Sequence, residues 1–376
     1  MCNIAAYAGN RQAAPILLEM LRNQQDFDGG LSTGIATIHE GKLYYRKMVG
    51  SVDDMIKNSD VLDLPGTIGI AHSRPGGMMG LIKPDFSSKV TSSFMPTGSR
   101  PYGQNRFDAI HPSFNTEETL ALVTNGGHPP FSPYGDTWDE AFRELSENGY
   151  IFETAIDNPE GKHPNYNGKC VNVGELRADL ADYYIKQGLP VSQALANMCT
   201  RMFTDNVTVL LSEAEPDKVF ACRACRPMYA VTTKGETYIA TTRFAFSDEL
   251  NQEEVFSLPL MHVCEVSREG LKITSDRIRR DKVCDVTPYA YHEAYDRIVK
   301  ELQGKKDAPL YFDDLEFFMA REALDIWPEQ HILTQGPRVV YDVLWQLKEE
   351  GRLKTTIKPL PTRYGPVDRV YMWLED

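Results

Sequence analysis

The chain has 376 residues, a formal net charge of −13 at pH 7 and a globular composition, with 42% hydrophobic and 25% charged residues. This length is enough to bury a substantial core, and it predicts two or three domains, or one large domain with a small one. The acidic charge argues against broad nucleic-acid binding, which needs a basic face, and no apolar run is long enough for a membrane span or a signal peptide.

The first part of the chain combines buried strands with an amphipathic helix. A strand is predicted over residues 4–8, followed by a helix that starts near Pro15 and by a hairpin over residues 33–48. Residues 67–72 form another buried strand. The segment 75–115 is rich in Gly, Pro and Ser without sustained periodicity, which is typical of a functional or disordered loop.

The middle of the chain runs from strands to helices and back to strands. A capping box of Thr137 and Glu140 predicts the start of a helix that ends near Gly149. The other strands and helices are predicted over residues 119–124, 174–187, 192–203, 206–212, 219–225, 229–233, 236–241 and 262–274. The hairpin connections favour antiparallel sheets packed with helices, an α+β layered fold, over a doubly wound parallel sheet.

The pattern changes near residue 285. The elements predicted beyond it are three helices and a two-strand ribbon, over residues 290–302, 313–324, 338–350, 353–358 and 369–374. This is the order of a winged-helix domain. We therefore place a boundary near 280–286 and predict two domains, residues 1–282 and a winged-helix-like domain of residues 286–376. The charges of the second domain are balanced, which favours a partner or specificity element over a generic DNA-binding module.

The seven cysteines are scattered, and an odd number without a signal peptide predicts reduced thiols in the cytoplasm. Cys222 and Cys225 form one CxxC pair, but a zinc site needs a second pair at suitable spacing, and the sequence contains none. We expect these two cysteines to pack in a strand. The sequence predicts no metal site and no cofactor.

Cysteine stands at position two. The small side chain of Cys2 permits removal of Met1, after which one residue would carry both a thiol and a free α-amine. The amine, or a water held by it, can then take the thiol proton, because an α-amine titrates near neutral pH. Position alone does not distinguish this hypothesis from an ordinary residue at position two, so it depends on the rest of the chain.

Three other segments could complete such a site. Arg74 ends a buried strand, where it can hold a carboxylate with two hydrogen bonds or be a surface arginine. Asn125 and Gly126 offer a side-chain amide and a backbone N–H for an oxyanion hole, although Asn-Gly is also a favoured tight turn. Asp157 follows residues 149–152 and can bind an amine or be a solvated loop aspartate.

In their order along the chain, these segments resemble the class II glutamine amidotransferases, and most closely the glutaminase half of glutamine–fructose-6-phosphate amidotransferase. Residues 69–74 are similar to the family's Gly-Ile-Ala-His-Thr-Arg strand, and His111 and Pro112 to a His-Pro step. Further similarity lies at Asn125 and Gly126, in residues 149–157 and in residues 221–241. The resemblance covers roughly residues 2–275.

The resemblance implies a four-layer αββα N-terminal-nucleophile hydrolase sandwich that acts on glutamine or a γ-glutamyl compound. It implies the catalytic residues Cys2, Asn125 and Gly126 and the substrate-binding residues Arg74, Asp157 and His72. Arg74 would bind the glutamine α-carboxylate and Asp157 the α-amine. The resemblance implies no metal, no cofactor and no membrane.

The chain departs from the family's pattern in three places. Asn3 stands where the family usually has Gly, and Pro75-Gly76-Gly77 follows the arginine in place of Trp-Ala-Thr. No sugar-isomerase or phosphoribosyl-transfer domain follows in the 376 residues. We therefore expect ammonia to pass to a partner protein or to be released, and we expect the partner to be a synthase or a second copy of the chain in a homo-oligomer.

Two other functions stay open at this point. The chain can be a glutamine-sensing regulator that retains the pocket and uses residues 286–376 to bind DNA or protein. It can also be another cysteine N-terminal-nucleophile hydrolase, such as an acylase of the bile-salt type. The segment His72-Ser73-Arg74 together with Asn125-Gly126 favours the amidotransferase.

Overall fold

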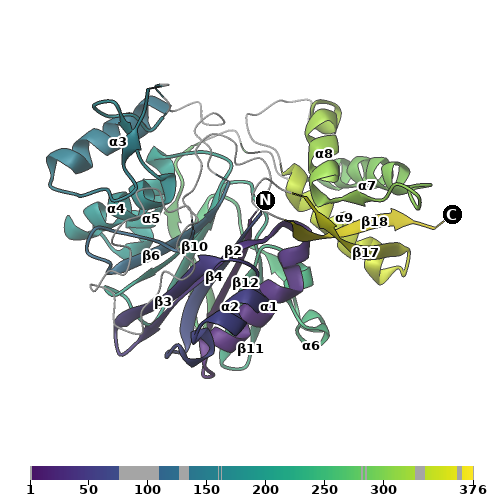
Figure 1. Cartoon of the computed structure of the whole chain (residues 1–376), viewed down its shortest axis with the longest axis horizontal. Coiled ribbons are helices and arrows are strands. Elements are labelled where there is room, and N and C mark those ends of the chain that lie inside the picture. Colours follow the sequence, from purple (N-terminus) through teal and green to yellow (C-terminus); the bar gives the residue numbers. More distant parts are fainter. Residues whose placement is uncertain are drawn as a thin grey trace.

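The computed structural model describes residues 2–75, 110–126, 135–159, 161, 163–280, 283, 286–326, 335–361 and 366–375. Residue 1, Cys284 and most of the predicted loop 75–115 lie outside these ranges. Two sheets stack against each other, helices cover their outer faces, and a smaller helical part lies at one side (Figure 1). None of the helices in these ranges combines the length and the hydropathy that a membrane crossing requires.

The first sheet has seven strands, all paired antiparallel. Strand β1 lies at its centre, which explains why its residues are fully buried. The strand order is β13 (Phe256–Ser257), β11 (Tyr229–Thr233), β12 (Glu236–Ala240), β1 (Asn3–Ala8), β4 (Ile68–Pro75), β2 (Gly30–His39) and β3 (Lys42–Val49). The predicted strands of this sheet and the hairpin over 33–48 are confirmed.

The second sheet has six strands and packs face to face on the first. Its order is β15 (Gly270–Arg277), β14 (His262–Ser267), β10 (Val219–Arg223), β9 (Val207–Ser212), β6 (Leu120–Asn125) and β5 (Ser113–Phe114). Ile4 and Ile70 of the first sheet share a buried apolar cluster with Val123, Val209 and Ala221 of the second. This cluster is the central core of the sandwich.

Helices cover both outer faces. Helices α1 (Ala13–Asp28) and α2 (Val52–Asn58) pack on the first sheet. Helices α3 (Gly135–Glu147), α4 (Val173–Lys186) and α5 (Val191–Arg201) pack on the second. The prediction of antiparallel sheets packed with helices is therefore confirmed. The smaller elements are η1 (Val61–Asp63), η3 (Arg243–Ala245), α6 (Asp248–Asn251), β7 (Ile156–Asp157) and β8 (Lys169–Cys170).

Two local predictions were wrong or incomplete. The capping box of Thr137 and Glu140 is not formed, because α3 already begins at Gly135 and the Thr137 hydroxyl donates to the Arg201 carbonyl. Helix α2 was not predicted, although Ser51 and Asp54 form a complete capping box at its start. Its seven residues are too few to show a clear helical period.

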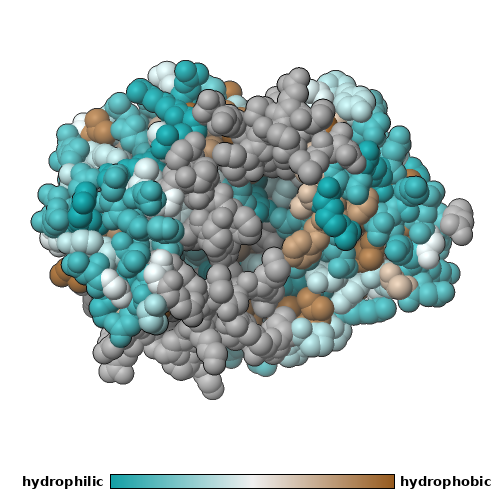
Figure 2. Space-filling model, turned by 90° about the horizontal axis from the view of Figure 1, so that it is seen from above, coloured by the Kyte–Doolittle hydropathy of each residue, from teal (hydrophilic) through white to brown (hydrophobic). Residues whose placement is uncertain are grey.

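Residues 286–375, the C-terminal unit, contain the predicted helices and ribbon and one additional short strand. These elements are α7 (Pro288–Leu302), β16 (Leu310–Tyr311), α8 (Phe312–Ile326), α9 (Gly336–Glu349), β17 (Leu353–Leu360) and β18 (Val367–Leu374). The three strands form one sheet in the order β16, β18, β17. Seen from above, the described surface is mostly hydrophilic, and apolar side chains gather on the side of this unit (Figure 2).

The C-terminal unit packs directly against the sandwich. Phe27 of α1 belongs to the unit's apolar cluster, and its ring lies 6.0 Å from that of Tyr341, centroid to centroid. The buried Arg369 of β18 donates from Nη1 to the carbonyl of Gly29, at 2.9 Å. The boundary predicted near residues 280–286 falls between β15 and α7, but the apolar contacts continue across it.

Candidate active site

Strand pairing brings the start of the chain next to the end of β4. In the antiparallel register of β1 and β4, Asn3 lies opposite Ser73 and Ile4 lies opposite His72. Cys2 directly precedes Asn3, and Arg74 directly follows Ser73. The start of the chain and the end of β4 thus lie on neighbouring strands, although they are far apart in the sequence.

Asn125 joins this position from the other sheet. The Cys2 backbone N–H donates to Asn125 Oδ1 at 3.1 Å, and Asn125 Nδ2 donates to the Cys2 carbonyl at 2.9 Å. Asn125 ends β6 and is 2% exposed, so its amide is held in place by the surrounding core. An amide nitrogen carries two N–H groups, so that one can bind Cys2 while the other serves a substrate oxygen.

The residue after Asn125 must be glycine. Gly126 has a φ of 82°, a backbone conformation that L side chains rarely adopt. A Cβ at this position would also lie 2.4 Å from the carbonyl oxygen of Asp205. The close approach of these two backbone segments places Gly126 beside Asp205, next to the Asn125 amide.

A buried polar cluster supports the end of β4. Arg74 is 8% exposed and His72 is 1% exposed, and the His72 ring lies 4.6 Å from that of His111, centroid to centroid. Burial, followed by the Arg74 charge, lowers the pKa of His72 to about 3. Burial likewise lowers the pKa of His111, and the neighbouring His72 ring and the Arg74 charge add to this effect. Both rings are therefore neutral at physiological pH.

This cluster predicts acid sensitivity. His72 resists protonation in the folded state down to about pH 3, whereas an unfolded histidine titrates near 6.5. Between pH 6.5 and pH 3, protonation of this histidine stabilises the unfolded state but not the folded one, so the free energy of unfolding decreases as the pH falls. At pH 5 this decrease amounts to about 2 kcal/mol. When the pH is lowered from 7.5 to 5, we expect the urea midpoint of unfolding to decrease less in His72→Gln than in the wild type. The exposed His39→Gln serves as the control and should retain the wild-type pH dependence.

Asp157 has a described ion pair with Lys169. It is on the short β7–β8 ribbon, its side chain is 85% exposed, and its carboxylate pairs with Lys169 across the ribbon. This partner, Lys169, is not one of the predicted site residues. Among the predicted site residues, the structure brings Asn125 into contact with Cys2, and His72 and Arg74 are buried near the end of β4.

Cys2 differs from the other described cysteines in its exposure. Cys2 is partly exposed, whereas the remaining described cysteines are buried, namely Cys170, Cys199, Cys222, Cys225 and Cys264. Burial raises the pKa of Cys264 to about 12 and also raises that of Cys225. Cys222 and Cys225 are both buried, as predicted, but only Cys222 lies in a strand, because β10 ends at Arg223. Within the described ranges, Cys2 is the accessible thiol.

Sequence reasoning missed a charged group beside Gly126. Arg226 donates from Nε to the carbonyl of Asp205 at 3.1 Å and to its carboxylate at 2.9 Å. It also donates from Nη1 to Glu316 of α8 at 2.5 Å. No sequence signal points to this group, because its members are separated by 21 and 90 residues.

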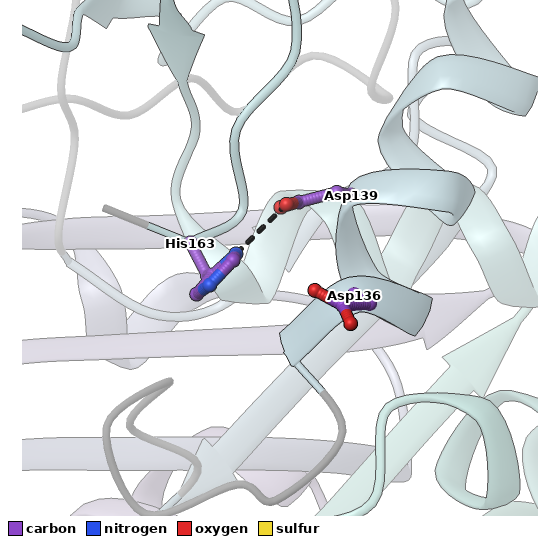
Figure 3. A group of neighbouring side chains, drawn as sticks. All are labelled: Asp136, Asp139 and His163. Carbon is purple, nitrogen blue, oxygen red and sulfur yellow. Dashed lines mark hydrogen bonds and ion pairs between the residues drawn. The ribbon is translucent and has the colours of Figure 1, made fainter. Parts of the chain in front are cut away.

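Two groups of described residues could each offer three ligand atoms to a metal ion. Asp136, Asp139 and His163 form the first, in which His163 Nδ1 lies 2.8 Å from Asp139 Oδ2 (Figure 3). Asp139 also accepts the backbone N–H of Asn165 at 2.6 Å. These oxygens are therefore engaged by protein donors, and the group is largely exposed.

The second group is Asp28, Asp313 and Glu316. It lies where the C-terminal unit meets the sandwich, next to two arginines. Glu316 pairs with Arg226, and Arg369 lies 3.9 Å from Asp28. Guanidinium groups thus supply positive charge to these carboxylates.

Known proteins resemble this chain in sequence and in fold. No protein-family model matches the chain. Glutamine–fructose-6-phosphate aminotransferase [isomerizing] of Pyrococcus horikoshii is 25% identical over 246 residues, which are 65% of this chain and 33% of that protein. The enzyme of the same name from Caldanaerobacter subterraneus subsp. tengcongensis is 27% identical over 241 residues, 64% of this chain and 31% of that protein. The resemblance to the class II glutamine amidotransferases is confirmed.

The amidotransferase domain is one part of larger proteins among these relatives, since the chain spans about a third of their length. Two solved structures share its fold. The glutamine phosphoribosylpyrophosphate amidotransferase from B. subtilis matches with a TM-score of 0.53 and 16% identity, over 80% of this chain and 58% of that one. The allosteric regulatory enzyme of purine biosynthesis matches with a TM-score of 0.55 and 14% identity, over 82% and 58%.

Proposed function

We propose that this chain hydrolyses the side-chain amide of glutamine, or of a γ-glutamyl relative, with the Cys2 thiol as nucleophile. The observation that carries the proposal is the pair of hydrogen bonds between the Asn125 amide and the Cys2 backbone. These bonds hold the residue that bears the thiol next to a fixed amide donor. An N-terminal cysteine beside an oxyanion donor is what acyl transfer from an amide requires.

The reaction begins once Met1 has been removed. The α-amine of Cys2 takes the thiol proton, and the thiolate attacks the amide carbon. Asn125 Nδ2 and the Gly126 N–H stabilise the negative charge that develops on the oxygen. The protonated amine then gives its proton to the departing ammonia, which leaves a thioester that water cleaves to glutamate. The contact with Asn125 Oδ1 keeps the nitrogen of Cys2 oriented throughout.

The amino-acid end of the substrate would be held next to the thiol. Arg74 lies at the end of β4, one register step beyond the pair Asn3 and Ser73, and is proposed to bind the α-carboxylate. His72 is neutral and 1% exposed, and supports Arg74 from behind. Asp157 is proposed to hold the α-amine, which requires it to exchange its ion pair with Lys169 for the substrate.

This division of roles predicts different kinetic effects. Arg74→Ala should raise the KM for glutamine strongly, because it removes a contact made with the bound substrate, and Arg74→Lys should recover part of the loss. Asn125→Ala should lower kcat by about 10²–10³, the usual effect of removing one oxyanion donor. Steady-state ammonia release measures both. Equal changes of KM and kcat in both variants would contradict the assignment.

Ammonia release from glutamine, together with the intact mass of the protein, tests the function itself. We expect a mass without Met1 and release of ammonia that requires Cys2. Binding of glutamine without release of ammonia would instead favour the glutamine-sensing regulator. Release of an acyl group from a bile-salt-type amide but not of ammonia from glutamine would favour the acylase.

The C-terminal unit is proposed to be winged-helix-like and to act on partner choice or on the fate of ammonia. Three helices followed by a ribbon support this proposal. The core face of its third helix is formed by the buried residues Val339, Val340, Val343, Leu344 and Leu347. The acceptor of the nitrogen would be supplied by a partner synthase.

A further inference from the structure

One segment of the sandwich connects the candidate site with the C-terminal unit. Residues 223–229 link β10 to β11, and each of three side chains in this segment contacts the unit. Arg223 Nη1 donates to Gln335 Oε1 at 3.2 Å, Arg226 Nη1 to Glu316 Oε1 at 2.5 Å, and the Tyr229 hydroxyl to Asp342 Oδ1 at 2.5 Å.

Of these contacts, the one made by Arg226 continues to the oxyanion position. Arg226 Nε donates to both the carbonyl and the carboxylate of Asp205, at 3.1 and 2.9 Å. The same carbonyl oxygen of Asp205 is the atom nearest to a Cβ added at Gly126, at 2.4 Å, and Arg226 Nε would lie 3.2 Å from that Cβ. Arg226 therefore fixes the backbone against which Gly126 packs.

The charges make this arrangement sensitive to Glu316. The side chains of Arg226, Asp205 and Glu316 are 17%, 13% and 22% exposed, so little water screens them. Burial alone would raise the pKa of Glu316, but the Arg226 charge lowers it below its usual value. Glu316 is thus ionised, and its charge holds the Arg226 guanidinium between two carboxylates.

We propose that Glu316 of the C-terminal unit is a positioning residue for the oxyanion hole, acting through Arg226 and Asp205 on Gly126. The inference rests on the function proposed above and extends it. Docking of the C-terminal unit then sets kcat for amide hydrolysis and does more than select a partner. A shift of this unit that withdraws Glu316 would release Arg226 and loosen the backbone around Gly126.

The test compares two substitutions at the same interface in the full chain. Glu316→Gln removes the negative charge that faces the Arg226 guanidinium, and the new side chain has nearly the same size and shape. Asp342→Asn is the matched control, because it alters the contact with Tyr229 but does not touch Arg226 or Asp205. We expect Glu316→Gln to lower kcat about tenfold with KM for glutamine unchanged, and Asp342→Asn to leave kcat unchanged. Melting temperatures show that both variants are folded.

Two further variants separate positioning from simple docking. Glu316→Asp retains the carboxylate and should recover most of kcat, even if Glu316→Gln folds poorly. The double variant Glu316→Gln with Arg226→Gln should have the kcat of Arg226→Gln alone, because the two residues act in one chain of contacts. Additive effects, unchanged kcat in Glu316→Gln, or equal losses in Glu316→Gln and Asp342→Asn would overturn the inference. A wild type that releases no ammonia would overturn the proposed function and this inference with it.

Discussion

Cys2→Ala should abolish ammonia release from glutamine and leave the protein folded, and a diazo-ketone analogue of glutamine should label the wild type at Cys2 alone. The reason is that thiol reactivity requires both access and a nearby base. Cys2 is partly exposed, whereas Cys222 and Cys225 are buried. Intact mass should show a single adduct, and peptide mapping should place it at the first residue of the trimmed chain.

Two controls sharpen this experiment. Cys222→Ser should leave the labelling and the ammonia release intact, since Cys222 is only 1% exposed in the wild type. A chain that retains Met1 should resist the analogue, because its α-amine is no longer on the cysteine. Adducts at Cys222 or Cys225, or full activity in Cys2→Ala, would refute the assignment of the nucleophile.

The second large effect is expected at Gly126. Gly126→Ala should lower kcat by about 10²–10³ with little change in KM, a loss as large as that of a complete oxyanion donor. The backbone of the new alanine would have to adopt a φ of 82°, and its Cβ would lie 2.4 Å from the Asp205 carbonyl oxygen. The backbone N–H would therefore be displaced. Steady-state kinetics of ammonia release at saturating glutamine measures the loss.

Gly188→Ala is the matched control for backbone strain. Gly188 has a φ of 90°, but an added Cβ there meets no other atom within 4 Å. This variant should lose some stability and retain the wild-type kcat. If both substitutions lowered kcat alike, the effect at Gly126 would reflect general destabilisation and not the loss of an oxyanion donor.

The contacts between the two parts of the chain affect how the enzyme is expected to work. Phe27 joins the apolar cluster of the C-terminal unit, and Arg369 reaches the carbonyl of Gly29. The helix that covers the first sheet is therefore shared by both parts.

The sequence by itself determined the features that depend on short-range patterns. The turn at Glu40 and Gly41 closes its hairpin as predicted, because a residue of positive φ next to glycine suits a tight turn. The buried strands and the amphipathic helices were predicted because apolar residues recur with a period of two or 3.6. The similarity in order of short motifs identified the amidotransferase domain and directed attention to Cys2, Arg74 and Asn125.

Only the tertiary structure decided which side chains touch. The register of β1 and β4 put Asn3 opposite Ser73 and Ile4 opposite His72, and the stacking of the two sheets brought Asn125 to the Cys2 backbone. Arg226 reached Glu316 across 90 residues. Local patterns report how each segment fills its own turn or strand, within a few residues. Contacts of this kind depend on how whole sheets and helices pack, and charged side chains leave no period in the sequence that would reveal their partners.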